Sequence, residues 1–172
     1  MSGAVMRELY RTIVAKKELS NEAKLYVFRS IYVPTLTYGH EILVMTERMR
    51  SRVQAAEMRF LRRVAGVRRI DRIRNSAIRE SLNVEPLLLK IERSQLRWFG
   101  HVLRMPPNRL PIRVYSAQPT GKRPVGRPRK TWRTELKSLC GRIGVDFTRV
   151  QSIAEDRDSW RTRIASLQSR PS

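Results

Sequence analysis

The side chains of this sequence that could do chemistry are mostly arginine and lysine, and the chemistry they suit is phosphate binding. The densest group is the stretch TGKRPVGRPRK, residues 120–130, which has five cationic side chains and no acidic one. Guanidinium and ammonium groups bind phosphate oxygens, and a guanidinium does so through a planar fork of N–H donors. Glycine and proline interrupt the stretch, so it has no helical period.

The core of this stretch, Gly126-Arg127-Pro128, resembles an AT-hook, a short peptide that places arginine in the minor groove of A·T-rich DNA. A narrow minor groove has an enhanced negative potential, and glycine lets the backbone approach closely. Three interpretations remain open for the stretch. It reads the minor groove, it binds phosphates regardless of sequence, or it is a nuclear address or plain linker.

A second cationic group is expected on a helix that begins after Thr46 and ends at Gly66. Its apolar residues, from Met49 to Val64, are spaced by three and four, so they form one stripe. Its arginines share the adjoining face, which can contact phosphates or be an ordinary solvated face. The residues expected to contact nucleic acid are Arg48, Arg52, Arg59, Arg62, Arg63, Lys122, Arg123, Arg127, Arg129, Lys130 and Arg133.

Catalytic and metal-binding side chains are scarce. The two histidines, His40 and His101, and the single Cys140 lack the paired spacing of a zinc site. His101 falls in a long apolar helix, where a buried core histidine is expected. Asp156 and Asp158 resemble a metal pair, but they stand where a helix is expected to start, and aspartate is favoured there as a cap. We expect no catalytic residues, no metal and no cofactor.

Composition agrees with a polyanionic partner. The 172 residues have a formal net charge of +21 and 41% hydrophobic residues, enough for a modest core. A domain this basic usually faces nucleic acid, so DNA or RNA is the expected partner. The apolar runs are too short to span a bilayer and the amino-terminal residues lack a signal-peptide core, so no membrane partner is expected. The expected location is the nucleus, otherwise the cytoplasm.

Capping residues and periodicity predict helices and no strands. Ser20, Thr46, Thr131, Asp146 and Asp156 are the expected helix caps. Pro34 is expected to end or kink the first helix, and Pro86 to start a long helix that Pro106 stops. A shorter helix is expected over 76–82. The aromatic residues of these helices, Trp98, Phe99, Trp132 and Trp160, fit core packing better than base stacking.

These elements predict an all-α fold in three parts: a helical region over 1–105, an extended basic connector over 106–130, and a small helical region over 131–172. The connector lies in an interval, Arg93 to Thr134, that contains no acidic residue, eleven lysines and arginines, and six of the nine prolines. Composition therefore changes here from helical core to basic connector.

Three runs of the chain, residues 16–66, 78–111 and 119–133, closely resemble the C-terminal part of reverse transcriptases from LINE-type (non-LTR) retrotransposons. Their most specific pieces are Tyr38-Gly39, the segment RFLRRVAG at 59–66, and RWFGH at 97–101. The resemblance extends from about Gly3 to Trp160. It implies that the first helical region is thumb-like and grips the template–primer duplex, and that a basic tail follows.

The resemblance also implies what this chain is not expected to do alone. The family's polymerase carboxylates belong to a Tyr-x-Asp-Asp type motif, and no adjacent Asp-Asp pair occurs in this sequence. We therefore expect no polymerase activity from the chain alone, and a palm domain is a possible separate partner. The chain is expected to be a truncated element copy or a gene-model fragment. The alternatives are a helical docking fragment, suggested by the broad apolar face over 88–105, or a retroelement relic without function.

Overall fold

The computed structural model describes residues 8, 12–13, 16, 18–117, 121, 125–126 and 129–168, and within them the chain is all helical, without a β-strand. The chain forms two compact units. The first unit contains residues 1–39 and 45–90, and the second contains residues 40–44 and 91–172. The expected all-α class is confirmed. The boundary between the units lies between residues 90 and 91, inside a helix. Composition instead places a boundary after residue 105.

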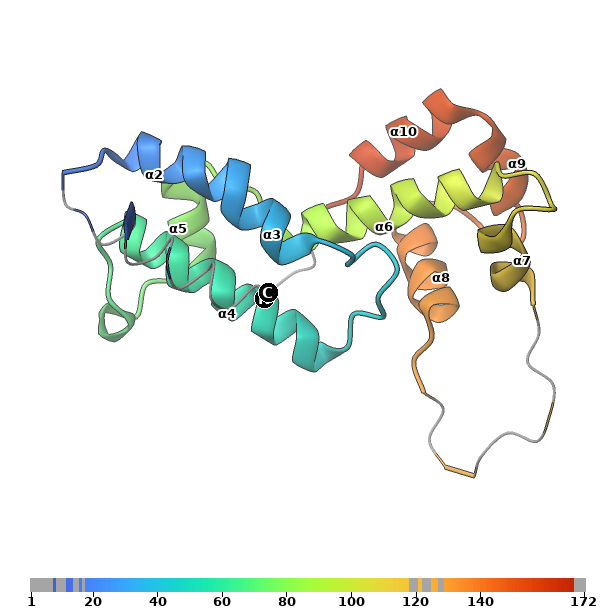
Figure 1. Ribbon diagram of the computed structural model, residues 1–172, viewed down its shortest axis with the longest axis horizontal. Helices are drawn as coiled ribbons and strands as arrows, with labels where there is room; N and C mark the ends of the chain where they lie inside the picture. Colours follow the sequence, from blue (N-terminus) through green and yellow to red (C-terminus); the bar gives the residue numbers. More distant parts are fainter. Residues whose placement is uncertain are drawn as a thin grey trace. The chain divides into compact units, whose positions relative to one another are not determined.

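The helices of the first unit follow one another in chain order (Figure 1). They are α2 (Asn21–Val27), the π-helix η2 (Phe28–Tyr32), α3 (Val33–Thr37), α4 (Glu47–Val64), the 3-10 turn η3 (Arg69–Asp71), α5 (Asn75–Ser81) and the start of α6 (Leu87–Leu103). Ser20 caps α2 by accepting a hydrogen bond from the Ala23 N–H, and Thr46 caps α4 by accepting one from Met49. Gly66, at φ +67°, follows α4 in the left-handed conformation that ends helices.

Pro34 does not end the first helix. The helix widens before Pro34 into the π-helix η2, where the Val33 N–H donates to Phe28 O, five residues back. The hydroxyl of Thr35 then donates to Ile31 O at 2.7 Å, which offsets backbone bonds that a proline disturbs. The widened turn also shifts the helix phase: Tyr32 and Val33 are buried, while Ile31 is exposed.

The core of the first unit centres on three aromatic rings. Phe60 of α4 lies 5.0 Å from Phe28 and 4.8 Å from Tyr32, between ring centroids. Tyr32 stays buried because its hydroxyl donates to Ala56 O at 2.8 Å. The aliphatic residues buried in this unit are Leu25, Val33, Val53, Leu61, Val64, Ile78, Leu87 and Leu89. The expected apolar stripe of α4 therefore faces the core.

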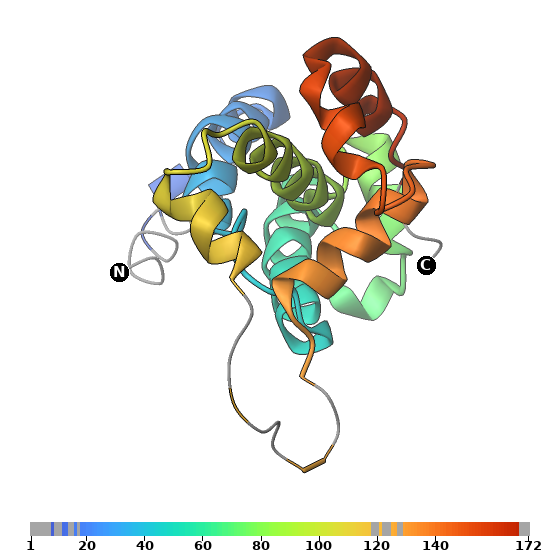
Figure 2. The ribbon, with the colours of Figure 1, turned by 90° about the vertical axis from the view of Figure 1, so that its right-hand side faces the viewer.

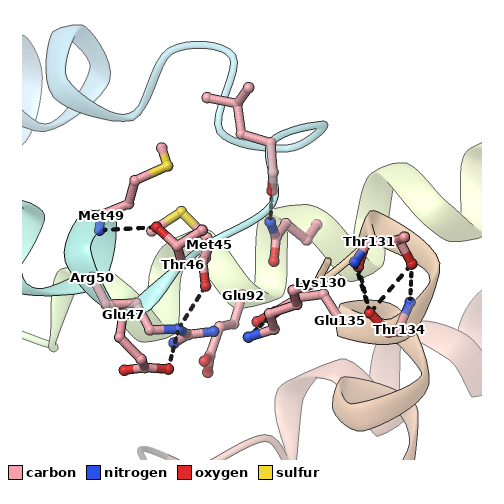
Figure 3. Close-up of polar contacts among 12 residues, drawn as sticks. Met45, Thr46, Glu47, Met49, Arg50, Glu92, Lys130, Thr131, Thr134 and Glu135 are labelled. Atoms are coloured by element: carbon pink, nitrogen blue, oxygen red, sulfur yellow. Dashed lines mark hydrogen bonds and ion pairs between the residues drawn. The ribbon is translucent and has the colours of Figure 1, made fainter. Parts of the chain in front are cut away.

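The second unit contains the rest of α6, then α7 (Leu110–Ser116), α8 (Trp132–Arg142), α9 (Val150–Glu155) and α10 (Arg157–Ala165) (Figure 1). Thr131 caps α8 through a reciprocal pair of bonds with Thr134, shown in Figure 3. Asp156 caps α10 by accepting bonds from the N–H groups of Asp158 and Ser159. Both expected caps are confirmed.

Phe99 of α6 is the centre of the second core. Its ring contacts four others, those of Tyr115, Trp132, Phe147 and Trp160, at centroid distances from 5.4 to 6.4 Å. The indole N–H of Trp132 donates to Glu41 O at 2.9 Å, and that of Trp160 to Leu96 O at 3.0 Å. Trp132 and Trp160 therefore pack in the fold, as their helical spacing predicts.

Three local expectations differ from the structure. Asp146 does not cap α9, which begins four residues later; its carboxylate accepts from the Thr148 N–H in a turn. Residues 110–116 form helix α7, although the connector was expected to be extended, because Pro111 occupies the first turn, where proline is tolerated. Finally, His101 is exposed and its ring lies tilted against that of Trp98, at 5.3 Å between centroids, so the expectation of a buried core histidine is wrong.

Candidate nucleic-acid interface

The arginines of α4 lie where the sequence places them, on the face beside the buried stripe. Arg48, Arg52, Arg59 and Arg63 are all exposed, whereas Val53, Phe60 and Val64 of the same helix are buried. We call these four residues the α4 arginine row. Because buried side chains fix the rotation of α4, the four guanidinium groups are presented to solvent together along about four turns of helix.

The two acidic residues of α4 are placed differently. Glu57 is fully buried, and its carboxylate accepts bonds from Arg79 at 2.7 and 3.1 Å and from the Leu87 N–H at 3.0 Å. Its charge is therefore neutralised inside the first unit. Glu47 is exposed and lies 4.0 Å from Arg50. The exposed side of α4 consequently has four arginines against one glutamate, which is a strongly cationic surface.

Arg62 has a different environment from the α4 arginine row. It is half-buried, and its Nη2 donates to Ile73 O at 2.8 Å and to Asn75 Oδ1 at 2.9 Å. Arg50 is buried too, and its Nε donates to Met45 O, as Figure 3 shows. These two guanidinium groups hold the chain at the two ends of α4. Only the exposed arginines of the helix are well placed for a ligand.

Sequence reasoning missed a third basic element, the turn that follows α4. Arg68, Arg69, Arg72 and Arg74 are all exposed here. The Arg68 N–H donates to Asp71 Oδ2 at 2.7 Å, and Arg72 has a left-handed backbone at φ +51°, so the turn has a defined conformation. The signal was the run VRRIDRIR at 67–74, in which four of eight residues are arginine. It lacks an apolar period and was overlooked for that reason.

The basic stretch of the second unit is only partly within the described residues. Lys122, Arg123 and Arg127 lie outside them. Arg129 is exposed, and Lys130 pairs with the buried carboxylate of Glu135, as Figure 3 shows. Arg133 places its guanidinium over the Tyr115 ring at 5.3 Å and within 6.0 Å of Phe147. Lys130 and Arg133 thus also stabilise the base of the stretch.

The helices on either side of the stretch are held together. Tyr115, near the end of α7, and Trp132, at the start of α8, pack edge to face at 6.3 Å between ring centroids. Figure 2 shows the ribbons of α7 and α8 next to each other. Burial raises the pKa of the Tyr115 hydroxyl, and the nearby Arg133 only partly opposes this effect. This aromatic pair therefore joins α7, which precedes the stretch, to α8, which follows it.

Other chemistry has little support from the described side chains. Within the described ranges, no three histidine, cysteine or acidic side chains gather as metal ligands. Asp156 is occupied as the cap of α10. Cys140 is fully buried, and burial raises the pKa of its thiol to about 12. None of the described helices is long and apolar enough to cross a bilayer.

The broad apolar face of α6 is covered by the protein's own core. Leu96, Phe99 and Val102 are all at most 2% exposed. The alternative of a helical docking fragment was suggested by this face and requires that it be exposed. Since the second unit buries it, this face does not provide such a surface.

One curated protein is similar to this chain. It is a transposon-derived protein of Caenorhabditis elegans whose role is uncharacterized, and it is 28% identical over 146 residues. The match covers 80% of this chain but 52% of that protein, so the chain spans about half the length of its relative. No family model matches the chain, and no solved structure does. The similarity fits an origin in a transposable element.

Proposed function

We propose that this chain is a nucleic-acid-binding part of a LINE-type reverse transcriptase, and that the first unit grips a duplex by its backbone phosphates. The observation that supports the proposal is the α4 arginine row, four exposed guanidinium groups on a helix whose inner glutamate is neutralised by Arg79. The basic turn over 68–74 extends the same charge along the chain. Similarity to a transposon-derived protein supports the retroelement origin.

Phosphate contact, without base recognition, is the chemistry that suits this surface. The row lies on a helix whose rotation is fixed by its buried side chains. Arginine binds phosphate oxygens through two parallel N–H bonds. Contacts to the backbone position a protein on a duplex but do not read its sequence. A thumb that holds a template–primer duplex needs this property, since it must accept every sequence. Polymerase carboxylates would belong to a palm outside this chain, and the nucleus is the location that this ligand implies.

Salt dependence of binding tests the proposal. If about six cationic side chains engage phosphates, affinity for duplex DNA or an RNA–DNA hybrid falls roughly a thousandfold between 50 and 200 mM salt. Replacing Arg52 and Arg59 with glutamine removes two contacts, so the slope of log K against log salt becomes shallower by about 1.8. The matched control is Arg109→Gln with Arg113→Gln, which removes two exposed arginines, one just before α7 and one within it.

A flat salt response of the unmodified chain would exclude phosphate gripping altogether. Equal slopes for the α4 variant and the α7 control would exclude the α4 arginine row as the contact surface. Both measurements use fluorescence anisotropy on the full chain, with circular dichroism to confirm that each variant retains its helices.

The basic stretch over 120–130 is proposed to add phosphate contacts of the same kind. Replacing Arg127 and Arg129 with alanine should then weaken binding to A·T-rich and G·C-rich duplexes alike. A loss confined to A·T-rich DNA would instead assign the stretch to the minor groove, as in an AT-hook.

A further inference from the structure

The second unit has a cationic groove that no part of the proposed function uses. It has a volume of about 590 Å³ and lies between α6 and α10, with Trp160 and Ile164 among its lining residues. The charged and titratable side chains that line it are Arg93, Arg97, His101, Arg104, Arg157 and Arg161. We call it the arginine groove. Within the described residues, no acidic side chain lines it.

Helix geometry explains the two rows of arginines. Arg93, Arg97 and His101 follow one another at intervals of four on α6, and Arg104 comes just after its end. Arg157 and Arg161 are also four residues apart, on the first two turns of α10. Residues four apart share a helix face, so each helix presents one row to the groove.

The helices that bear these rows are fixed in position. The Trp160 indole N–H donates to Leu96 O at 3.0 Å, and Gly100 leaves room for the ring. Arg93 donates to Leu167 O at 3.0 Å, and Arg104 donates to Ala154 O at 2.6 Å. These carbonyl groups orient the two arginines. The groove is therefore preformed and does not need a ligand to assemble it.

Positive charges on the two walls of the groove repel one another. Arg104 has a pKa lowered first by burial and then by the charge of Arg157. Arg161 lies 3.4 Å from Asp158, which is exposed and does not line the groove. The described residues that line the groove thus include five arginines and no carboxylate. An anion that entered would relieve this repulsion and occupy guanidinium donors that face water.

We propose that the arginine groove binds the backbone phosphates of a single nucleic-acid strand. Its volume is that of a small-molecule pocket, which suits one strand better than a duplex. The row on α6 extends about 16 Å from Arg93 to Arg104, at 1.5 Å per residue. Phosphates are spaced about 3.4 Å apart along one strand of a helix, so this length matches several of them. The inference rests on the proposed function in that its ligand is a nucleic acid.

The test compares binding of a single-stranded 15-mer and of its duplex by the full chain and two variants. In Arg97→Gln with Arg157→Gln, both groove walls lose a charge while side-chain volume is kept. For single strands each phosphate contact contributes about 0.7 to the salt slope, so the slope becomes shallower by about 1.4. The ratio of affinities at 50 and 200 mM salt then falls about sevenfold. Duplex binding should change no more than in the control.

The control is again Arg109→Gln with Arg113→Gln, which has the same net charge as the groove variant. Equal single-strand slopes for the two variants overturn the inference, as does an equal loss of duplex and single-strand binding by the groove variant. A polyglutamate of matched charge that binds as tightly as the 15-mer also overturns it, since the groove would then accept any polyanion.

Failure of this inference and failure of the proposed function give different results. If Arg52→Gln with Arg59→Gln weakens duplex binding while the groove variant matches its control, the α4 arginine row stands and the groove assignment is wrong. If the groove variant loses strand binding while Arg52→Gln with Arg59→Gln leaves the salt slope of duplex binding equal to that of the control, the groove stands and the assignment of α4 is wrong.

Discussion

The indole of Trp160 lies directly over Gly100, at the one point where α6 has no side chain. A Cβ on Gly100 would lie 2.7 Å from Trp160 Cδ1, closer than any real contact allows. The ring is 2% exposed and is held by its bond to Leu96 O, so it cannot move aside without losing that bond. Gly100 is therefore required by the close approach of α10 to α6.

Gly100→Ala should destabilise the second unit despite the better helix propensity of alanine. The propensity gain is about 1 kcal/mol, whereas overpacking a rigid core costs about 1–3 kcal/mol and also breaks the Trp160 bond here. We expect a net loss of about 1–2 kcal/mol in urea unfolding monitored by tryptophan fluorescence. The matched control is Gly141→Ala in α8, where a Cβ has nothing within 4 Å. This control should be stabilised, by up to about 1 kcal/mol. A stabilised Gly100→Ala would contradict the packing.

The buried pair Glu57–Arg79 predicts an asymmetric mutant cycle. Removing Arg79 leaves a fully buried carboxylate without its charge partner, which costs about 3–5 kcal/mol. Replacing both residues by leucine removes the charge as well, so the double variant should be closer to the unmodified protein than Arg79→Leu is. Chemical unfolding of the single and double variants measures the coupling.

The Leu87 N–H adds a complication that the cycle can detect. It donates to Glu57 Oε1 at 3.0 Å, so any variant without Glu57 leaves this donor at the start of α6 unpaired. We therefore expect Glu57→Gln with Arg79→Leu to be more stable than the double leucine variant, because a glutamine carbonyl can still accept this bond. The opposite order would show that the bond to Leu87 contributes little.

Much of the fold follows from local sequence signals. Ser20, Thr46, Thr131 and Asp156 all cap the helices that follow them, as predicted, because a side-chain oxygen at that position satisfies a free backbone N–H. The exposed arginines of α4 were predicted for a similar reason. A helical period places an apolar stripe and its neighbouring face in a fixed relation, and burial of the stripe determines the exposure of the row.

The features that sequence reasoning missed depend on contacts between distant residues. The π-helix before Pro34 forms because it lets both Tyr32 and Val33 reach the core. This core includes Phe60, which comes 28 residues after Tyr32 in the sequence. The arginine groove joins residues from α6 and α10, which are about 60 positions apart, and no local period reveals such a pair. His101 is exposed because its neighbours Gly100 and Val102 are buried, so that its own side chain points away from the core.

Cys140 should be inert in the folded protein and should make stability depend on high pH. Burial raises the pKa of its thiol from an ordinary value of 9.0 to about 12. Because the folded pKa is the higher one, this contribution to stability is complete below pH 9 and is lost as pH rises toward 12, at up to about 1.4 kcal/mol per pH unit.

Two measurements check the prediction for Cys140. Alkylation by iodoacetamide at pH 8 should be slow in buffer and fast in denaturant, since only the unfolded chain exposes a thiolate. Between pH 9 and 11, the Cys140→Ala variant should lose less unfolding free energy than the unmodified chain. Rapid alkylation in buffer would show that α8 opens readily and that its burial is not maintained.

Asp156 should act as a helix cap and not as a metal ligand. Its carboxylate accepts bonds from Asp158 and Ser159 at 3.0 and 3.3 Å, at the start of the helix that bears Arg157 and Arg161. Asp156→Ala should cost about 1 kcal/mol of unfolding free energy, while Asp156→Asn, whose side-chain oxygen can make the same bonds, should retain most of it. Urea unfolding with tryptophan fluorescence measures both variants, with and without EDTA or added Mg²⁺. A metal-dependent rise in the stability of the unmodified chain that Asp156→Asn abolishes would contradict the capping role, because asparagine preserves the cap but removes the charge that a cation needs.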